Sequence, residues 1–569
     1  MPGESKEHVA LYTITVNGAE IDPKQRDRLK EIRVVNNLRL PDVCTISITY
    51  PKAEGIDKHP FAIGLKLEVR LGAKEKQATE TLFKGDIVTL EPSFGSGGVA
   101  LLVRAFDRAH LLHRARRVRT FQNQTATDIV GSICRENGLS YEGQASGSPY
   151  EFMMQENLTD WDFIWQLAER AGFEFLVEDS TAKFRKPGSG ETVALEWPKT
   201  LQSFNPRVTA VQQVKSVSLA AHDPKTKQKI EKTTNWNASM QVATIGLGRD
   251  AVANPFAAAN VHIATEPVKS TAEAEAVTQA LLEKLSNGYV AAEGVAFGNP
   301  KLKAGTMIQV SGVGEKFSGT YRIATASHVL RGGGSYLTTF ANSGAHTILG
   351  MVGGANGGGP DFASGLVLGI VTNNNDPDNM GRVRVMIPAL GKDTTNKDAE
   401  GWWARIASVS AGNQRGLMML PVVGEEVLLG FEHGDITRPY VLGSLFNGKD
   451  VPGNDLLQEK NGSFALKSDE KAYIQTKKDL TIKSDGKMIV EVAQDVEEKF
   501  KAAWKNETTG QASLKATQAF QVEGQSVTVK GQTGVTIESS ATVTLKVGGS
   551  SVEVSQMGVK ISGPMINIG

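Results

Sequence analysis

The last 50 residues of the chain contain a short repeat that restricts the fold more than any other feature. Glycines such as Gly531 and Gly548 separate its units, at points where the chain has to turn sharply. A short, nearly fixed period predicts a repeat architecture built from short strands. The unit reads apolar, polar, apolar, polar or glycine, and it starts at Phe520, Val527, Val535, Val543, Val552, Val559 and Ile566, at spacings of 7, 8, 8, 9, 7 and 7 residues.

The alternation gives each short strand one apolar face, which has to be covered. The repeat itself supplies neither a helix nor a second sheet for this purpose. We therefore expect identical copies of the chain to wind together around a shared axis. An ordinary antiparallel sheet or a single-chain β-solenoid is the alternative. The residues predicted to fill the axis are Val527, Val529, Val535, Ile537, Val543, Leu545, Val552, Val554, Val559 and Ile561.

Residues 9 to about 345 predict mostly strands, with three helices among them. The helices are expected at 125–138, 158–172 and 271–288. In the second of these, Thr159 and Asp162 are spaced as in a capping box, and Gly172 suits the position after the last turn.

Length and composition exclude several classes of protein. A chain of 569 residues is too long for one core, so several domains are expected. Lys plus Arg and Asp plus Glu are equal at 62 each, which argues against nucleic acid or an anionic membrane surface as the main partner. The two cysteines, Cys44 and Cys134, are interpreted as buried thiols in a reducing compartment. The N-terminus predicts no secretory signal, and no apolar run approaches the ~18 residues of a membrane helix.

A glycine-rich segment at 351–364 is expected to be a linker. Residues 366–447 follow as a β-rich unit of a size that suits a small barrel. This unit resembles the OB-fold domain of the VgrG family, the spike proteins of contractile injection systems. The matching elements are Gly369-Ile370-Val371, Asp376-Pro377, Gly381-Arg382-Val383, Pro388, Trp402 to Arg405, Gly416, Pro421, Gly424 to Val427, Phe431, Gly434-Asp435 and Arg438 to Gly443.

Residues 106–130, 155–175 and 302–330 resemble the hub region of the same family, and the C-terminal repeat resembles its needle. The resemblance implies a mainly β fold. It places a hub of β-barrel domains with a few helices at 1–350, the linker at 351–364, an OB-fold barrel at 365–450, and a triple-stranded β-helical needle, formed as a trimer, at 451–569.

The resemblance also implies a structural, non-enzymatic homotrimeric spike without cofactor or metal. Its hub is expected to bind the inner tube protein and baseplate components, and a PAAR-type protein is expected to cap the tip. Cargo and transient contact with a target membrane are further expectations. The protein is expected to be made in the bacterial cytoplasm and to reside in the assembled particle. The residues predicted to bind the cap are Pro564, Met565, Ile566, Asn567, Ile568 and Gly569.

A spike that degrades polysaccharide or peptidoglycan is the alternative function. Catalysis by Glu425 and Glu426 is not favoured, because adjacent residues on a strand point to opposite faces. His433-Gly434-Asp435 offers two metal ligands without further partners at usable spacing, so a turn is predicted. Ser327 and His328 are adjacent in sequence, which does not make a catalytic triad.

Three segments have competing interpretations. The oxygen-rich run 373–379 lacks the spacing of an EF-hand loop, and a solvated strand connection is predicted. The basic run 108–119 is predicted to form intersubunit or tube-facing salt bridges rather than to bind nucleic acid. Residues 495–510 have a local helical pattern, but an in-register needle favours strand there.

Overall fold

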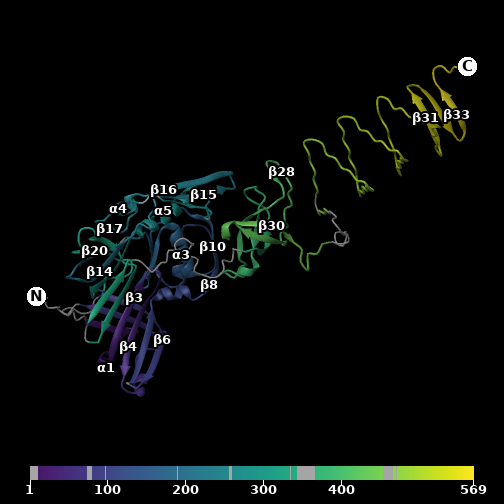
Figure 1. The fold of residues 1–569 in the computed structure, drawn as a ribbon. Coiled ribbons are helices and arrows are strands. Elements are labelled where there is room, and N and C mark those ends of the chain that lie inside the picture. The colour runs from purple at the N-terminus through teal and green to yellow at the C-terminus, as the bar shows by residue number, and fades with distance from the viewer. Residues whose placement is uncertain are drawn as a thin grey trace. The chain divides into compact units, whose positions relative to one another are not determined.

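The structure is a computed structural model of the chain. It describes residues 11–72, 80–96, 98–188, 190–255, 259–264, 266–332, 335–342, 365–452, 466–468 and 471–568. The chain divides into two units, Met1–Ala465 and Leu466–Gly569. Strands predominate in the first unit, as the sequence predicts (Figure 1). The predicted linker at 351–364 lies outside the described residues.

The largest element of the first unit is an 11-stranded sheet that joins segments far apart in the sequence. Its central contact pairs β22 with β3, antiparallel, with Arg331 opposite Glu31. In spatial order the strands are β14 (Leu201–Val208), β19 (Val290–Phe297), β23 (Tyr336–Ala341), β22 (Thr325–Arg331), β3 (Leu29–Asn37), β4 (Leu40–Tyr50), β7 (Gly98–Phe106), β6 (Glu80–Gly95), β5 (Lys66–Gly72), β1 (Leu11–Val16) and β2 (Ala19–Glu20).

Smaller sheets complete the region that the sequence predicts as a hub. β10 pairs with β8, and β15 lies between β16 and β18. The bounds of these smaller-sheet strands are β8 (Arg116–Gln124), β9 (Ser140–Gly143), β10 (Tyr150–Thr159), β11 (Glu174–Glu178), β12 (Thr181–Arg185), β13 (Thr192–Glu196), β15 (Ser216–Asp223), β16 (Gln228–Asn235), β17 (Thr244–Ile245), β18 (Asn260–Ile263), β20 (Met307–Ser311) and β21 (Gly319–Arg322).

All three predicted helices are present: α2 (Ala126–Glu136), α3 (Asp160–Ala171) and α5 (Thr271–Asn287). The Thr159 side chain accepts a hydrogen bond from the Asp162 amide at the start of α3. Gly172 ends this helix with φ +67°, a conformation that favours glycine. The short helical turns are α1 (Pro23–Arg26), α4 (Arg249–Ala253), η1 (Ala53–Lys58), η2 (Arg108–His113), η3 (Ala238–Met240), η5 (Pro388–Leu390) and η6 (Glu432–Gly434). No described helix is both long and apolar enough to cross a membrane.

Residues 367–445 form a closed five-stranded barrel. Its order β24-β25-β26-β30-β29 is antiparallel except between β26 and β30, where Arg405 lies opposite Tyr440. This strand order is that of an OB fold. The barrel strands and the adjoining hairpin are β24 (Val367–Asn373), β25 (Val383–Met386), β26 (Glu400–Ile406), β29 (Glu426–Phe431), β30 (Pro439–Leu445), β27 (Ala411–Gly412) and β28 (Arg415–Gly416).

The core of this barrel continues into the hub region. Buried Val371, Val385 and Val427 belong to the same apolar cluster as Phe152 and Met154 of β10. The barrel is therefore packed against the hub through side chains and is not attached by the chain connection alone.

The second unit contains a zigzag with a regular period (Figure 1). The backbone bends at 477–478, 485–486, 493–494, 501–502, 509–510 and 517–518, every eight residues. Extended segments lie between the bends and make no strand pairs within the chain before Thr542. Residues 495–510 follow the same period and contain no helix, so the helical interpretation of this segment is wrong.

The chain then forms an antiparallel three-stranded sheet of β31 (Thr542–Val547), β32 (Ser550–Ser555) and β33 (Gly558–Ser562). Within residues 542–562 the strands pair inside one chain, as in the antiparallel alternative, while the winding of copies around a shared axis stays a prediction. The physical cause is the turn Gly548-Gly549, in which Gly548 has φ +53°. Two glycines between alternating strands favour a tight hairpin.

Candidate functional site

The three-stranded sheet at the C-terminus has one apolar face. Val543 lies opposite Val554, and Val554 lies opposite Val559, so these three side chains form one row. A second row contains Leu545, Val552 and Ile561. All six residues are among the ten predicted for the needle axis, and the strand register brings them together on a single surface.

This apolar face is not covered within the described part of the second unit. Leu545 is 64% exposed, Val559 63% and Ile561 52%. The opposite face carries Thr544 and Lys560, which suit contact with water. An uncovered apolar face backed by a polar one is typical of a protein–protein interface.

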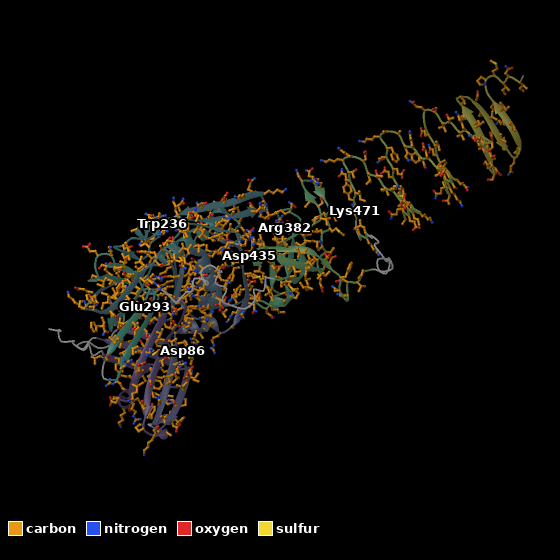
Figure 2. The ribbon with its side chains drawn as sticks, in the orientation of Figure 1. Asp86, Trp236, Glu293, Arg382, Asp435 and Lys471 are labelled. Carbon is orange, nitrogen blue, oxygen red and sulfur yellow. The ribbon has the colours of Figure 1, made fainter. Side chains whose placement is uncertain are left out.

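The other four predicted axis residues, Val527, Val529, Val535 and Ile537, lie on the extended segments before this sheet. Each is more than half exposed. Side chains project from a single layer of chain beyond Lys471 (Figure 2). These four residues therefore lie on successive repeats, and no apolar residue from elsewhere in the described second unit covers them.

The predicted cap-binding residues follow β33. Met565 and Ile568 are strongly exposed, and Ile566 is about half exposed. Residues 564–568 form no strand, and Gly569 lies outside the described residues. The described part of this terminus is a small apolar surface.

The barrel carries a second exposed apolar surface. It lies between hairpin β27–β28 and β29, where Leu417, Met418, Met419, Leu420, Val422 and Val423 are all exposed. Met418 also lies against Gly381, where an added Cβ would meet its methyl carbon at 2.7 Å. One side of the segment therefore packs on the barrel, while most of its apolar surface faces solvent.

The residue after Gly381, Arg382, binds Asp376 through its Nε and Nη2 atoms, at 3.0 and 2.7 Å (Arg382 is labelled in Figure 2). The same carboxylate accepts hydrogen bonds from the backbone N–H groups of Asp378 and Met380. Burial alone would raise the pKa of Asp376, but the Arg382 hydrogen bonds and the backbone donors lower it to about 2. The carboxylate holds the loop closed and has little capacity left for a metal ion.

Two protein-family models match the first unit, one over the predicted hub region and one over the barrel. The model described as the Alg8 N-terminal domain matches residues 6–332, more than half of the chain. The model described as the type VI secretion system/phage-baseplate injector OB domain matches residues 367–446, which are the closed barrel and its loops.

The Pseudomonas aeruginosa type VI secretion system spike protein VgrG1a is 25% identical over an alignment of 377 residues, and the match covers 60% of this chain and 55% of that protein. The spike protein VgrG1b of the same organism is also 25% identical over 377 residues and is covered over 48% of its length. The chain belongs to the VgrG spike family, with an Alg8-type N-terminal domain. It spans about half the length of these curated relatives.

Two of the solved structures similar to this VgrG-family chain are a type VI secretion component and a VgrG complex. An Escherichia coli type VI secretion component, described as similar to bacteriophage T4 tail proteins gp27 and gp5, has a TM-score of 0.47 at 16% identity and covers 76% of this chain and 99% of its own. The half-lidded Francisella PdpA–VgrG complex has a TM-score of 0.46 at 8% identity and covers 81% of this chain and 80% of its own.

The residues weighed for catalysis or metal binding in this VgrG-family chain have structural roles. Asp435 accepts hydrogen bonds from the Thr437 backbone and hydroxyl, and His433 lies in a turn with φ +53°. The described residues contain no group of three or more His, Cys, Asp or Glu side chains placed to hold a metal. The run 373–379 leaves β24 and connects it to β25, as predicted, but Asp376 in it is buried rather than solvated.

One arginine of the basic run 108–119 does not behave as predicted. Arg119 is buried and binds Gln155 at 2.6 Å and Glu136 at 2.6 Å, and it also forms an ion pair with buried Asp160. The prediction of intersubunit or tube-facing salt bridges is therefore wrong for Arg119, which joins β8 to the start of α3 inside one chain. Arg114 and Arg116 remain exposed.

His328 is fully buried in the 11-stranded sheet. Its ring nitrogens contact the Tyr336 hydroxyl at 2.8 Å and the Leu302 carbonyl at 3.1 Å. Burial lowers the pKa of His328 to about 3, so the ring stays neutral and is part of the core. Cys44 and Cys134 are free and buried, as predicted.

Sequence reasoning missed two features of this site. The Gly548-Gly549 dipeptide between alternating strands signals the terminal hairpin. The run Leu417–Val423, with only Pro421 to interrupt its apolar side chains, signals an exposed surface because it lies outside the barrel strands. Both signals were present in the printed sequence.

Proposed function

We propose that this chain is the spike at the tip of a contractile injection system, that it works as a homotrimer, and that it is not an enzyme. The observation that carries the proposal is the apolar face of the C-terminal sheet. Its two rows are in register across three strands and lack a cover within the described second unit. Family membership and the names of the curated relatives support the role as a spike.

Identical copies are the simplest cover for such a face. Three sheets packed with these faces inward bury the same residues in each copy and leave Thr544 and Lys560 in water. Each fully buried valine, leucine or isoleucine contributes about 1.5 to 3 kcal/mol. The extended repeats before Thr542 gain in addition the strand partners that a single chain does not provide.

The N-terminal hub binds the six-fold inner tube and the baseplate. A PAAR-type protein caps the exposed apolar residues at 564–568. The protein resides in the assembled particle, carries cargo there, and contacts a target membrane during injection. The match of residues 367–446 to the injector OB domain supports a place in such a particle, and the exposed apolar terminus supports the cap.

A spike that cleaves polysaccharide or peptidoglycan is the second candidate. Such an enzyme needs two carboxyl groups about 5 to 9 Å apart around the scissile bond. Glu426 begins β29 and Glu425 immediately precedes it, so the two side chains diverge. One relative is named an actin cross-linking toxin, but its match to this chain covers 83 residues, 8% of that protein.

The mass of the purified full chain in solution tests the trimer. Sedimentation equilibrium is expected to give three times the chain mass of 61.0 kDa. A monomer at micromolar concentration would overturn the trimeric assignment. Release of soluble fragments from peptidoglycan or polysaccharide by the same preparation would overturn the non-catalytic assignment. Binding of a PAAR-type protein to the wild type but not to Ile568→Asp tests the cap.

A further inference from the structure

The eight-residue period extends further along the chain than the C-terminal repeat. From 477 to 518 the backbone bends every eight residues, and each extended segment has six residues. The second position of every segment from 479 to 524 is apolar, even through the stretch with a helical pattern. These second positions are Leu480, Met488, Val496, Trp504, Ala512 and Phe520.

The fourth position of each segment is apolar as well, with two exceptions. Glu498 and Asn506 occupy this position in two consecutive segments. Before and after them it holds Ile482, Val490, Leu514 and Val522. The pattern is therefore interrupted once, over two neighbouring repeats.

An ion pair shows which face Glu498 occupies. Lys499 Nζ lies 2.6 Å from Glu497 Oε1, so residues 497 and 499 share one face of the extended segment. Glu498 lies on the other face, with Val496 and Phe500 at the alternate positions. The ring of Phe500 stacks on that of Trp504 with centroids 6.0 Å apart, which continues this apolar surface around the bend.

A needle built only from equivalent repeats has a register problem. If one chain slips by eight residues along the others, each apolar position meets another apolar position and most of the buried contacts are restored. The apolar residues of these repeats thus favour assembly without defining one alignment of the chains.

We propose that Glu498 and Asn506 form a polar layer that fixes the alignment of three chains in the needle. The inference rests on the proposed trimer with its apolar face inward. In register, three carboxyl groups and three carboxamides lie in adjacent layers and supply one another with hydrogen-bond donors and acceptors. A slip of one repeat places Glu498 of one chain beside Val490, and Asn506 of another beside Leu514. Each polar group left unpaired in this way carries a desolvation cost.

The carboxyl group of Glu498 makes the assembly of this layer depend on protonation. At the inward positions from 480 to 516, Glu498 is the only titratable residue, and the charged groups nearest to it, Asp495, Glu497 and Lys499, lie on the outward face. Three carboxylates without an inward cation repel one another, so the layer takes up protons from solvent when the chains assemble. A neutral carboxyl group then donates a hydrogen bond, which a carboxylate cannot do.

Distances between spin labels test the alignment. Cys44 and Cys134 are buried, so a label on Ser513→Cys, at an exposed outward position, reports from the needle alone. In the labelled trimer we expect a single interchain distance. In the same protein with Glu498→Val and Asn506→Val we expect a trimer with additional, longer distances from slipped chains.

The matched control changes Glu497→Gln and Lys505→Gln, which alter the outward positions of the same two repeats. This control is expected to keep the single distance. If the Glu498→Val, Asn506→Val protein also keeps a single distance, the polar layer does not set the alignment and the inference fails while the trimer stands. A chain that sediments as a monomer overturns both.

The pH dependence of trimer dissociation tests proton uptake. Wild type and Glu498→Gln are heated in the presence of EDTA from pH 5 to pH 9, and the difference between their dissociation midpoints cancels groups elsewhere in the chain. Because the assembled layer binds protons, the advantage of Glu498→Gln over wild type is expected to grow as pH rises. A difference that stays constant across this range contradicts the protonated layer. Glu497→Gln serves as the control.

Discussion

The ring of Phe152 on β10 stacks on the ring of Trp402 on β26, with centroids 4.9 Å apart and planes inclined by 20°. Lys269 and Arg384 also lie against the Trp402 ring, with their cationic groups 5.7 and 5.9 Å from its centroid. Together with the shared apolar cluster, these contacts fasten the OB barrel to the hub.

Replacing Trp402 with alanine is therefore expected to separate the unfolding of the barrel from that of the hub. Loss of this half-buried ring should cost about 2 to 3 kcal/mol. Differential scanning calorimetry should show the barrel melting as a separate, earlier transition. Trp403→Ala is the matched control, because the Trp403 side chain is adjacent to Trp402 in sequence and points to the other face of β26. Equal effects of the two substitutions would contradict a specific role for the Phe152–Trp402 stack.

Asp42 makes the stability of the hub depend on pH. Burial raises its pKa to about 7, although its contacts with Asn36 and Asn37 oppose the shift. Asn36 lies 2.5 Å from an Asp42 carboxylate oxygen, while its own Oδ1 has no hydrogen-bond partner. If the Asn36 side-chain amide is turned by 180°, its oxygen faces Asp42 and accepts a hydrogen bond from the protonated carboxyl group.

The folded state thus binds a proton that the unfolded chain, with an aspartate pKa of about 3.9, has already released at neutral pH. The stability that Asp42 contributes in this way is fully present below about pH 4 and is lost as pH rises through about 7. The thermal midpoint of the wild type should fall between pH 5.5 and pH 8.5, and that of Asp42→Asn should fall less. Asp57→Asn, at an exposed carboxylate, should behave as wild type does.

Asp376 makes stability depend on pH in the opposite direction. Because its pKa is lowered to about 2, the stability that it contributes is present above about pH 4 and is lost as pH falls through about 2. Asp376→Ala leaves Arg382 buried without its bidentate partner and should cost about 3 kcal/mol at pH 7 in urea denaturation. Asp393→Ala changes a partly exposed loop carboxylate of the same barrel, which has hydrogen bonds but no buried arginine partner, and is expected to have less than half this effect. Equal losses would count against the role of the buried ion pair.

Val559→Asp tests the apolar face of the terminal sheet. A carboxylate in the middle of this row would be buried without a partner when three copies pack together. The trimer should then dissociate at a lower temperature or in less SDS than the wild type. Thr544→Asp adds the same charge to the opposite face of this sheet and should leave dissociation nearly unchanged. If Val559→Asp resists heat and SDS as well as the wild type does, the packing model is wrong.

Local signals in the sequence predicted much of the first unit. Thr159 and Gly172 mark the ends of α3 because capping depends on adjacent residues alone. The ordered matches at 369–443 predicted the barrel, whose closed strand order the structure confirms. The ten axis residues were identified from alternation, but their contacts in an assembly stay a prediction, because the described chain pairs only the last six of them.

Other features depend on tertiary contacts that local patterns do not encode. Arg119 belongs to a basic run, and only the fold brings Asp160 and Glu136 to it. Burial is the main cause of the elevated pKa of Asp42, and two residues distant in sequence near the same small cavity also act on it: Glu178 raises the pKa and Lys303 lowers it. The terminal hairpin was missed for another reason: an eight-residue repeat fits pairing within a chain and between chains, and the two glycines decide between them.

The pairing of β22 with β3 sets an order of events during synthesis. Arg331 contacts Glu31 across 300 residues of chain, so the central sheet cannot close until residue 331 has left the ribosome. The repeats emerge later and have no strand partners of their own before Thr542. The strands of the large sheet thus all come from one chain, whereas in the proposed trimer the repeats stay unpaired until other copies arrive. In such a trimer, synthesis of several copies from one messenger would shorten the time for which the repeats stay unpaired.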